Sequence, residues 1–254
     1  MISVPGTLSK REKKALFTEI LISGNAEESL RDLCASGRLR ELFPELHAMA
    51  GVTQPPEFHP EGDVFEHTMV MLRHMVFPDL LLGWSVLLHD VGKPLTRSVE
   101  ESGRIRFFSH EEKGAVMAEE ILKRFEFPEQ EINVVVHAVR NHMRFASVTG
   151  MRKAKLQRLI QEEHFGLELE LHRLDCISCH GKMQCFDFLL EEVLQMPLPE
   201  VPAMVTGKDL LALGVLPGRK MGVLLKKLKE LQSRGRFANP QQALEYAKKR
   251  IEYL

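Results

Sequence analysis

The chain has 254 residues, of which 44% are hydrophobic and 27% are charged, and this composition is ordinary for a globular protein with a sizeable core. A net charge of −1 argues against a protein that coats nucleic acid, but the charge is unevenly distributed. Residues 206–254 carry eleven Lys or Arg against four Asp or Glu, a local charge of +7 that leaves −8 for the rest of the chain. The sequence therefore predicts an acidic body and a basic tail.

We identify neither a signal peptide nor a membrane-spanning segment in this sequence. No stretch approaches the roughly 18 consecutive apolar residues of a membrane span, and residues 1–10 lack the apolar segment of a signal peptide. Three of the four cysteines cluster at Cys176, Cys179 and Cys185, which fits reduced thiols better than a disulfide framework. We therefore expect a cytoplasmic protein without a membrane partner.

The first sixty residues predict helices that lead into an irregular segment. Amphipathic periodicity predicts a helix over 9–22, a second helix after an N-cap at Asn25, and a third over 39–49 that is interrupted by Pro44. Three prolines and a glycine exclude regular structure over 53–63. This segment leads directly into the next helix.

The remainder of the chain is also predicted to be helical. Helices are expected over 64–76, 79–90, 110–124, 129–143, 151–162 and 165–190. Residues 101–104 form the turn of a β-hairpin candidate between 97 and 107. A proline-rich linker at 197–202 then precedes three short helical segments over 206–213, 219–233 and 240–253. The fold class is therefore all-α.

An imidazole and a carboxylate stand side by side at His89 and Asp90. The apolar run from Leu80 to Leu88 predicts a buried helix before them, and Gly92 and Pro94 predict its end directly behind them. Two metal ligands are therefore expected at the rim of a core.

Further histidines and an aspartate accompany this doublet. In chain order the candidate metal ligands are His67, His89, Asp90, His110, His142 and Asp175. This order resembles the HD superfamily of metal-dependent phosphohydrolases. The resemblance implies an HD-domain helical bundle at 63–196, with an N-terminal helical segment at 1–62 packed on it and a small, basic helical subdomain at 197–254.

The resemblance also implies the chemistry of the site. It places a first ion on His67, His89, Asp90 and Asp175 and a second ion on His110 and His142. The cofactor is then one or two divalent ions among Mn, Fe, Ni and Mg, because a mixed nitrogen and oxygen donor set without thiolate argues against a closed structural zinc site. Two ions about 3.5–4 Å apart activate water and clamp phosphoryl oxygens, so phosphoester hydrolysis is the expected reaction.

Several residues near these ligands are assigned roles from charge and position. We predict Asp90, Lys93 and Glu111 as catalytic residues, with Asp90 bridging the ions because a carboxylate offers two oxygens. Glu111 is expected to orient His110 or to move a proton. The residues predicted to bind the substrate phosphate are Lys93, Arg97 and Arg144.

The remaining histidines are alternative candidates. His137 lies five residues before His142, about 140° away on a helix, so the two cannot enter one pocket, and we favour His142. His59 is a candidate for the mouth of the pocket. The histidines expected at the surface or the edge of the core are His47, His74, His164 and His172.

Residues 176–180 spell the attachment motif of c-type haem. We reject a haem because no export signal is present and because the motif lies in a predicted helix directly after Asp175. Small cysteines that pack this helix are the expected explanation.

A closer resemblance follows from longer motifs. These are QPPEFHPEGDVFEHT at 54–68, LHDVGKP at 88–94, HEEKGA at 110–115, NHMRF at 141–145 and LDCISCHG at 174–181. They look like the C-terminal part of bacterial tRNA nucleotidyltransferases and poly(A) polymerase-like proteins, and 207–222 is similar to the tail of that family. Residues 1–66 contain neither the Gly-Gly/Ser turn nor the aspartate pair of the polymerising head, so no nucleotide addition is expected from this chain.

Two functions are therefore predicted. The first is a phosphohydrolase acting on nucleotides or RNA 3′-end phosphates, as a 2′,3′-cyclic phosphodiesterase or phosphatase. The alternative is the tRNA-binding body of a split nucleotidyltransferase with no catalysis of its own. Basic tail residues that could contact RNA, or form a solvated helix face instead, are Arg219, Lys220, Lys226, Lys227, Lys229, Arg234 and Arg236.

Overall fold

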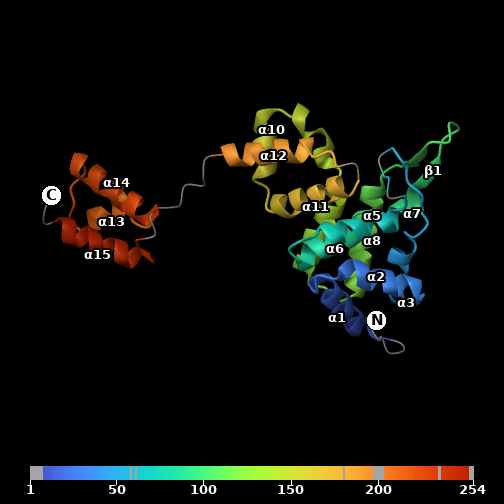
Figure 1. Ribbon diagram of the computed structural model, residues 1–254. Coiled ribbons are helices and arrows are strands. Elements are labelled where there is room, and N and C mark those ends of the chain that lie inside the picture. Colours follow the sequence, from blue (N-terminus) through green and yellow to red (C-terminus); the bar gives the residue numbers. More distant parts are fainter. Residues whose placement is uncertain are drawn as a thin grey trace. The chain divides into compact units, whose positions relative to one another are not determined.

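Helices form most of the chain, as the sequence predicts (Figure 1). The computed structural model describes residues 8–57, 59–60, 62–179, 181–196, 203–233 and 236–251. The chain divides into two compact units, Met1–Leu194 and Gln195–Leu254. The predicted linker at 197–202 lies outside the described residues.

The first unit contains the following elements in chain order: α1 (Lys10–Ile22), α2 (Ala26–Ala35), α3 (Arg38–Leu42), α4 (Pro44–His47), α5 (Val64–His74), α6 (Leu80–Leu88), α7 (Lys93–Thr96), β1 (Arg97–Val99), β2 (Ile105–Phe107), α8 (His110–Arg124), α9 (Glu129–Asn141), the 3-10 helix η1 (Arg144–Gly150), α10 (Lys153–Ile160), α11 (Phe165–Ser178) and α12 (Gln184–Gln195). The two strands pair antiparallel, with Ser98 opposite Arg106, and confirm the predicted hairpin. In Figure 1 this hairpin projects from the helices.

Helix starts follow from short polar side chains. The side-chain oxygens of Ser9, Asp63 and Asp79 accept hydrogen bonds from backbone amides in the first turns of α1, α5 and α6. Asn25 does occupy the N-cap position of α2, but its side chain makes no capping hydrogen bond.

Two helix predictions need correction, and two short helices were not predicted. The expected helix over 39–49 is two short helices, α3 and α4, because the chain turns at Phe43 and Pro44 starts a new helix. The expected helix over 165–190 is α11 and α12, because the backbone leaves helical geometry at Cys179 and Gly181 adopts a φ of +66°. The sequence also did not predict α7, where Pro94 stands in the first turn, or η1.

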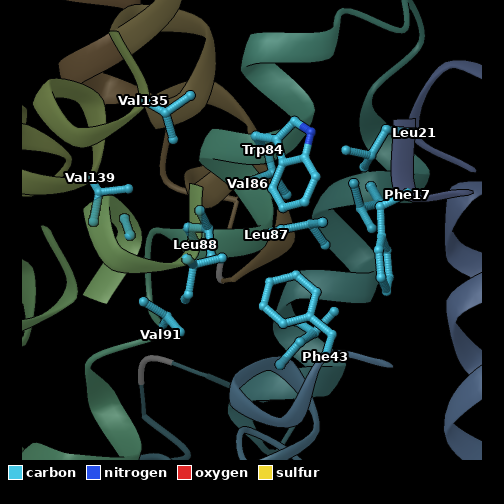
Figure 2. Close-up of a cluster of buried hydrophobic side chains, with 14 of the residues drawn as sticks. Phe17, Leu21, Phe43, Trp84, Val86, Leu87, Leu88, Val91, Val135 and Val139 are labelled. Carbon is cyan, nitrogen blue, oxygen red and sulfur yellow. The ribbon is translucent and has the colours of Figure 1, made fainter. Parts of the chain in front are cut away.

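The core of the first unit is built around α6. Helix α6 packs against α1, α5, α9 and α11, and α8 lies along α9. Figure 2 shows Trp84 and its α6 neighbours between Phe17 of α1, Phe43, and Val135 of α9. All of these side chains are buried. The ring centroid of Trp84 lies 5.5–6.2 Å from those of Phe17, Phe43 and Phe125. Each such aromatic side chain contributes several kcal/mol when buried, on the order of 3–5 kcal/mol by truncation.

The second unit contains α13 (Gly207–Ala212), α14 (Arg219–Ser233) and α15 (Pro240–Ile251). Its separate hydrophobic cluster includes Leu210, Leu224 and Ala247. Basic side chains are exposed on and beside α14, at Arg219, Lys220, Lys226, Lys227, Lys229 and Arg236, whereas Arg234 lies outside the described residues. None of the helices in the described part of the chain has the length and hydropathy needed to span a membrane.

Candidate metal centre

His89 and Asp90 stand where the buried helix α6 ends. Residues Leu82–Leu88 are all buried, so the core fixes the direction in which the helix delivers its last residues. The backbone of His89 is still helical and donates from its N–H to Ser85, and Asp90 follows in the turn that leads into α7. His89 and Asp90 are each 1% exposed.

A glycine brings this turn against α8. A Cβ on Gly92 would lie 2.3 Å from the backbone oxygen of His110 and 2.7 Å from the amide nitrogen of Gly114. Both neighbours are backbone atoms that cannot turn aside, so only glycine permits this approach. The close contact places His110, the first residue of α8, beside Asp90.

Three histidines surround the Asp90 carboxylate. Asp90 Oδ2 lies 3.1 Å from His89 Nε2, and Asp90 Oδ1 lies 3.3 Å from His110 Nε2 and 3.8 Å from His142 Nε2. Backbone carbonyl groups fix the same three rings on the side away from Asp90. Their Nδ1 atoms lie 2.7–2.9 Å from the backbone oxygens of Val86, Phe107 and Val139. Each Nδ1–H can therefore donate to a carbonyl, which leaves the Nε2 lone pairs directed at Asp90.

The protonation states of Asp90 and His142 favour binding of a cation. Burial by itself raises the pKa of Asp90, but the positive charges of His89, in its protonated form, and of Lys93 outweigh burial and hold that pKa well below its usual range. Burial and the neighbouring His89 lower the pKa of His142 to about 3, so this ring is neutral. Burial also lowers the pKa of His110, but Asp90 outweighs that effect and raises it.

These residues fit a divalent metal ion. His110 Nε2 and His142 Nε2 are 3.1 Å apart, and two lone pairs at this distance repel unless a proton or a cation lies between them. Among the described residues, no group offers a well-aligned hydrogen bond to the buried His89 Nε2 or Asp90 Oδ1. Unsatisfied buried polar atoms are costly, and a bound cation would satisfy them.

The other two predicted ligands adjoin this group. His67, fully buried on α5, places Nε2 3.1 Å from Asp175 Oδ1 on α11. Donor atoms of His67, His89 and Asp90 all lie within 4.8 Å of one another, and so do those of Asp90, His110 and His142. The structure therefore brings all six predicted ligands into one continuous cluster with Asp90 at its middle.

Lys93 ties the proline-rich segment to the cluster. Its Nζ lies 2.7 Å from Asp90 Oδ2 and donates a 2.6 Å hydrogen bond to Gln54 Oε1. Both Lys93 and Gln54 are buried. The ammonium thus balances the aspartate charge and holds the segment that precedes α5.

Glu111 lies behind His110. Its Oε2 is 3.4 Å from His110 Nδ1, on the opposite side of the ring from Asp90. In this position Glu111 can orient the ring of His110 but lies on the far side of it from Asp90.

Arg97 and Arg144 are not brought to the centre. Arg97 donates to Thr53 Oγ1 at 3.2 Å, and Arg144 forms ion pairs with Glu162 and Glu168. Neither arginine lines the cavity that opens beside His89 and Asp90. The structure therefore gives no support to the expectation that they contact a substrate phosphate, and proximity in sequence did not reveal that acidic neighbours would engage Arg144.

Arg144 has a structural task instead, because it neutralises the buried Glu168. Burial raises the pKa of Glu168, while Arg144 and His137 oppose that shift. We expect Arg144→Ala to lower the free energy of unfolding by about 2–3 kcal/mol, since it removes the guanidinium that pairs with a buried carboxylate. Chemical denaturation measures this loss. The exposed ion pair of Arg140 with Glu112 supplies the control, and Arg140→Ala should change stability by less than about 0.5 kcal/mol; equal losses in the two variants would contradict the assignment.

A cavity of about 630 Å³ opens beside the cluster of histidines and aspartates. His89, Asp90, Lys93, His110, His142 and Asp175 contribute to its wall. Sequence reasoning missed three cationic residues that also line it, namely Arg104, Arg106 and Lys182. Two of these lie on the hairpin, where alternation of Arg with Ile and Phe over 104–108 was the available signal.

The other histidines and the cysteines are distributed as follows. His59 does line the cavity, and so does His172, which the sequence placed at the surface or the edge of the core. His137 lies apart from His142, with Nδ1 2.6 Å from Glu168 Oε1. All four cysteines are free thiols. Cys176 is buried, as expected for packing, but Cys179 Sγ lies 3.4 Å from His59 Nδ1.

Comparison with known proteins agrees with this geometry. The HD domain family matches residues 64–174, the region that holds five of the six clustered ligands. The CC-adding tRNA nucleotidyltransferase of Thermus thermophilus is 33% identical over 250 residues, which are 94% of this chain and 56% of that protein. The A-adding tRNA nucleotidyltransferase of Deinococcus radiodurans is 32% identical over 251 residues, which are 92% of this chain and 56% of that protein.

A third relative matches a shorter region. The multifunctional CCA protein of Acinetobacter baumannii is 32% identical over 143 residues, or 56% of this chain and 34% of that protein. The chain thus spans about half the length of the relatives that match it most fully. Residues 64–174 match the HD domain family, and the chain resembles the C-terminal part of the tRNA nucleotidyltransferases.

Proposed function

We propose that the chain is a metal-dependent phosphohydrolase that acts on nucleotides or RNA ends, as a 2′,3′-cyclic phosphodiesterase or phosphatase. The observation that carries the proposal is the convergence of three imidazole Nε2 atoms on the buried Asp90 carboxylate. The adjacent cavity of about 630 Å³ supports it, because pockets of this size hold small-molecule ligands.

Six residues would hold the metal. The proposed ligands of a first ion are His67, His89, Asp90 and Asp175, and those of a second ion are His110 and His142, with Asp90 between the two. The chemistry that such ions supply when bound is Lewis acidity, which activates water and neutralises charge on phosphoryl oxygens. Nitrogen and oxygen donors suit ions of the Mn, Fe, Ni or Mg class.

The protein's own side chains bind and orient the substrate in this proposal. Lys93 keeps Asp90 ionised and places a positive charge at the wall of the cavity, and Glu111 orients His110 from behind. Arg104, Arg106 and Lys182 replace Arg97 and Arg144 as the groups that hold phosphate oxygens, because they line the cavity.

An exposed aromatic ring beside the cavity favours a substrate that carries a base. Phe108 lines the cavity and is 70% exposed, and the guanidinium of Arg106 lies 5.9 Å from its ring centroid. A nucleobase could stack on this ring while its phosphate reaches the metal cluster. Stacking of a base on an aromatic side chain contributes about 1–3 kcal/mol.

We expect Phe108→Ala to raise KM for 2′,3′-cyclic AMP by about 5- to 100-fold with a smaller change in kcat, because stacking adds binding energy without taking part in the reaction. Steady-state kinetics measure the change. Phe77 is 85% exposed and does not line the cavity, so Phe77→Ala is the control. A Phe108→Ala enzyme with wild-type KM would exclude the stacking role.

A second candidate function is the tRNA-binding body of a split nucleotidyltransferase. It is favoured by the matches to tRNA nucleotidyltransferases, which cover 92–94% of this chain, and by the exposed basic side chains of α14. This candidate predicts salt-sensitive binding of tRNA that does not depend on His89 or Asp90.

One experiment separates the two candidates. Protein purified without chelator is assayed for metal content, for hydrolysis of 2′,3′-cyclic AMP and a generic phosphodiester, and for tRNA binding. One or two divalent ions per chain together with turnover would support the phosphohydrolase. Metal-free protein that stays inert with added Mn, Ni or Mg, yet binds tRNA, would instead leave the binding body as the function.

A further inference from the structure

A second group of metal-ligating atoms adjoins the Asp90 cluster. Cys179 Sγ lies 3.4 Å from His59 Nδ1 and 3.8 Å from His67 Nδ1, and each of the three residues offers one donor atom within 4.8 Å of those of the other two. They come from separate parts of the chain: the proline-rich segment, α5, and the residue after α11. The fold therefore assembles this group, since no local sequence motif contains it.

The spacing of these atoms matches a tetrahedral zinc site. Bonds of about 2.3 Å to sulfur and about 2.0–2.1 Å to nitrogen, at tetrahedral angles, put sulfur and nitrogen ligands about 3.6 Å apart. The two observed separations lie on either side of this value. A small adjustment of the side chains would bring all three donors to bonding distance of one ion.

We propose that His59, His67 and Cys179 form a second metal site that takes a borderline-soft divalent ion such as Zn²⁺, with the fourth position open to water or a small ligand. A thiolate distinguishes this site from the nitrogen and oxygen donors around Asp90, because thiolates select zinc-like ions over Mg²⁺. Binding requires that Cys179 release its thiol proton to solvent.

Asp175 supports the proposed site from behind. His67 directs Nδ1 at Cys179 and Nε2 at Asp175 Oδ1, 3.1 Å away. With an ion on Nδ1, the Nε2–H donates to this carboxylate, an arrangement that orients metal-bound histidines. The phosphohydrolase proposed above uses the same Nε2 as a ligand, so the two sites compete for His67.

Cobalt spectroscopy tests the site without reference to turnover. The chelator-stripped full chain is titrated with Co²⁺ under reducing conditions, and a thiolate-to-cobalt charge-transfer band that Zn²⁺ removes is expected. Cys179→Ser should lose this band, and His59→Ala should weaken Co²⁺ binding by about 10- to 100-fold. Circular dichroism checks that each variant is folded.

Matched variants make the result decisive. Cys185 Sγ faces the backbone oxygen of Ala146, so Cys185→Ser should keep the band. His110→Gln removes a ligand of the other cluster and should keep it as well, which separates this proposal from the proposed phosphohydrolase. A wild-type protein without the band, or a Cys179→Ser variant that retains it, would overturn the assignment.

Discussion

In an Asp90→Asn variant, metal affinity is expected to fall by at least about 100-fold and hydrolysis of 2′,3′-cyclic AMP by at least about 10³-fold. The side chain keeps its shape, but it loses the charge on which His89, His110 and His142 converge. Metal analysis after gel filtration and single-turnover hydrolysis measure the two losses.

Two further variants test whether the losses in Asp90→Asn come from misfolding. Asp90→Asn also removes the partner of the buried Lys93 ammonium, so His110→Gln, which leaves that ion pair intact, should likewise reduce metal content and turnover. Asp187 is exposed on α12, and Asp187→Asn should behave as wild type. Normal turnover in folded Asp90→Asn protein would rule out the role assigned to this carboxylate.

Gly92→Ala is expected to lower the free energy of unfolding by at least about 3 kcal/mol. The added Cβ would lie 2.3 Å from the backbone oxygen of His110 and 2.7 Å from the amide nitrogen of Gly114, so the turn after α6 must move away from α8. That movement separates Asp90 from His110, and metal content should fall together with stability. Urea denaturation and metal analysis report the two effects.

A second glycine provides the comparison. Gly166 lies within α11, and a Cβ there would meet no atom within 4 Å. Gly166→Ala should therefore be neutral or stabilise the protein by up to about 1 kcal/mol, because alanine favours the helical backbone. A Gly92→Ala protein as stable as Gly166→Ala would show that α6 and α8 do not require this close approach.

Helices could be predicted from the sequence wherever local signals decide them. Periodic apolar residues and capping side chains such as Asp79 acted within a few residues of each boundary. The predictions failed where backbone geometry decided the outcome. The break between α11 and α12 depends on the left-handed φ of Gly181, whereas the apolar pattern continues on both sides of it. Helix α7 starts in a sequence that also fits the end of a helix.

In the candidate site, too, some features could be predicted from the sequence and others depend on the tertiary fold. The predicted ligands share one residue order with a known family, so they could be listed before their contacts were known. The partners of Arg144 could not, because Glu168 lies 24 residues further along the chain and meets it only after α11 has packed. Cys179 and His59 are separated by 120 residues, and only the tertiary fold brings the thiol to the imidazole.

The burial of α6 also restricts how the candidate metal centre can move. Amide hydrogens in a fully buried helix exchange with solvent only when the surrounding core opens, and His89 and Asp90 follow that helix without a break. These side chains therefore cannot loosen by fraying of a helix end. We expect loss of the side-chain cluster and global unfolding to form one cooperative thermal transition.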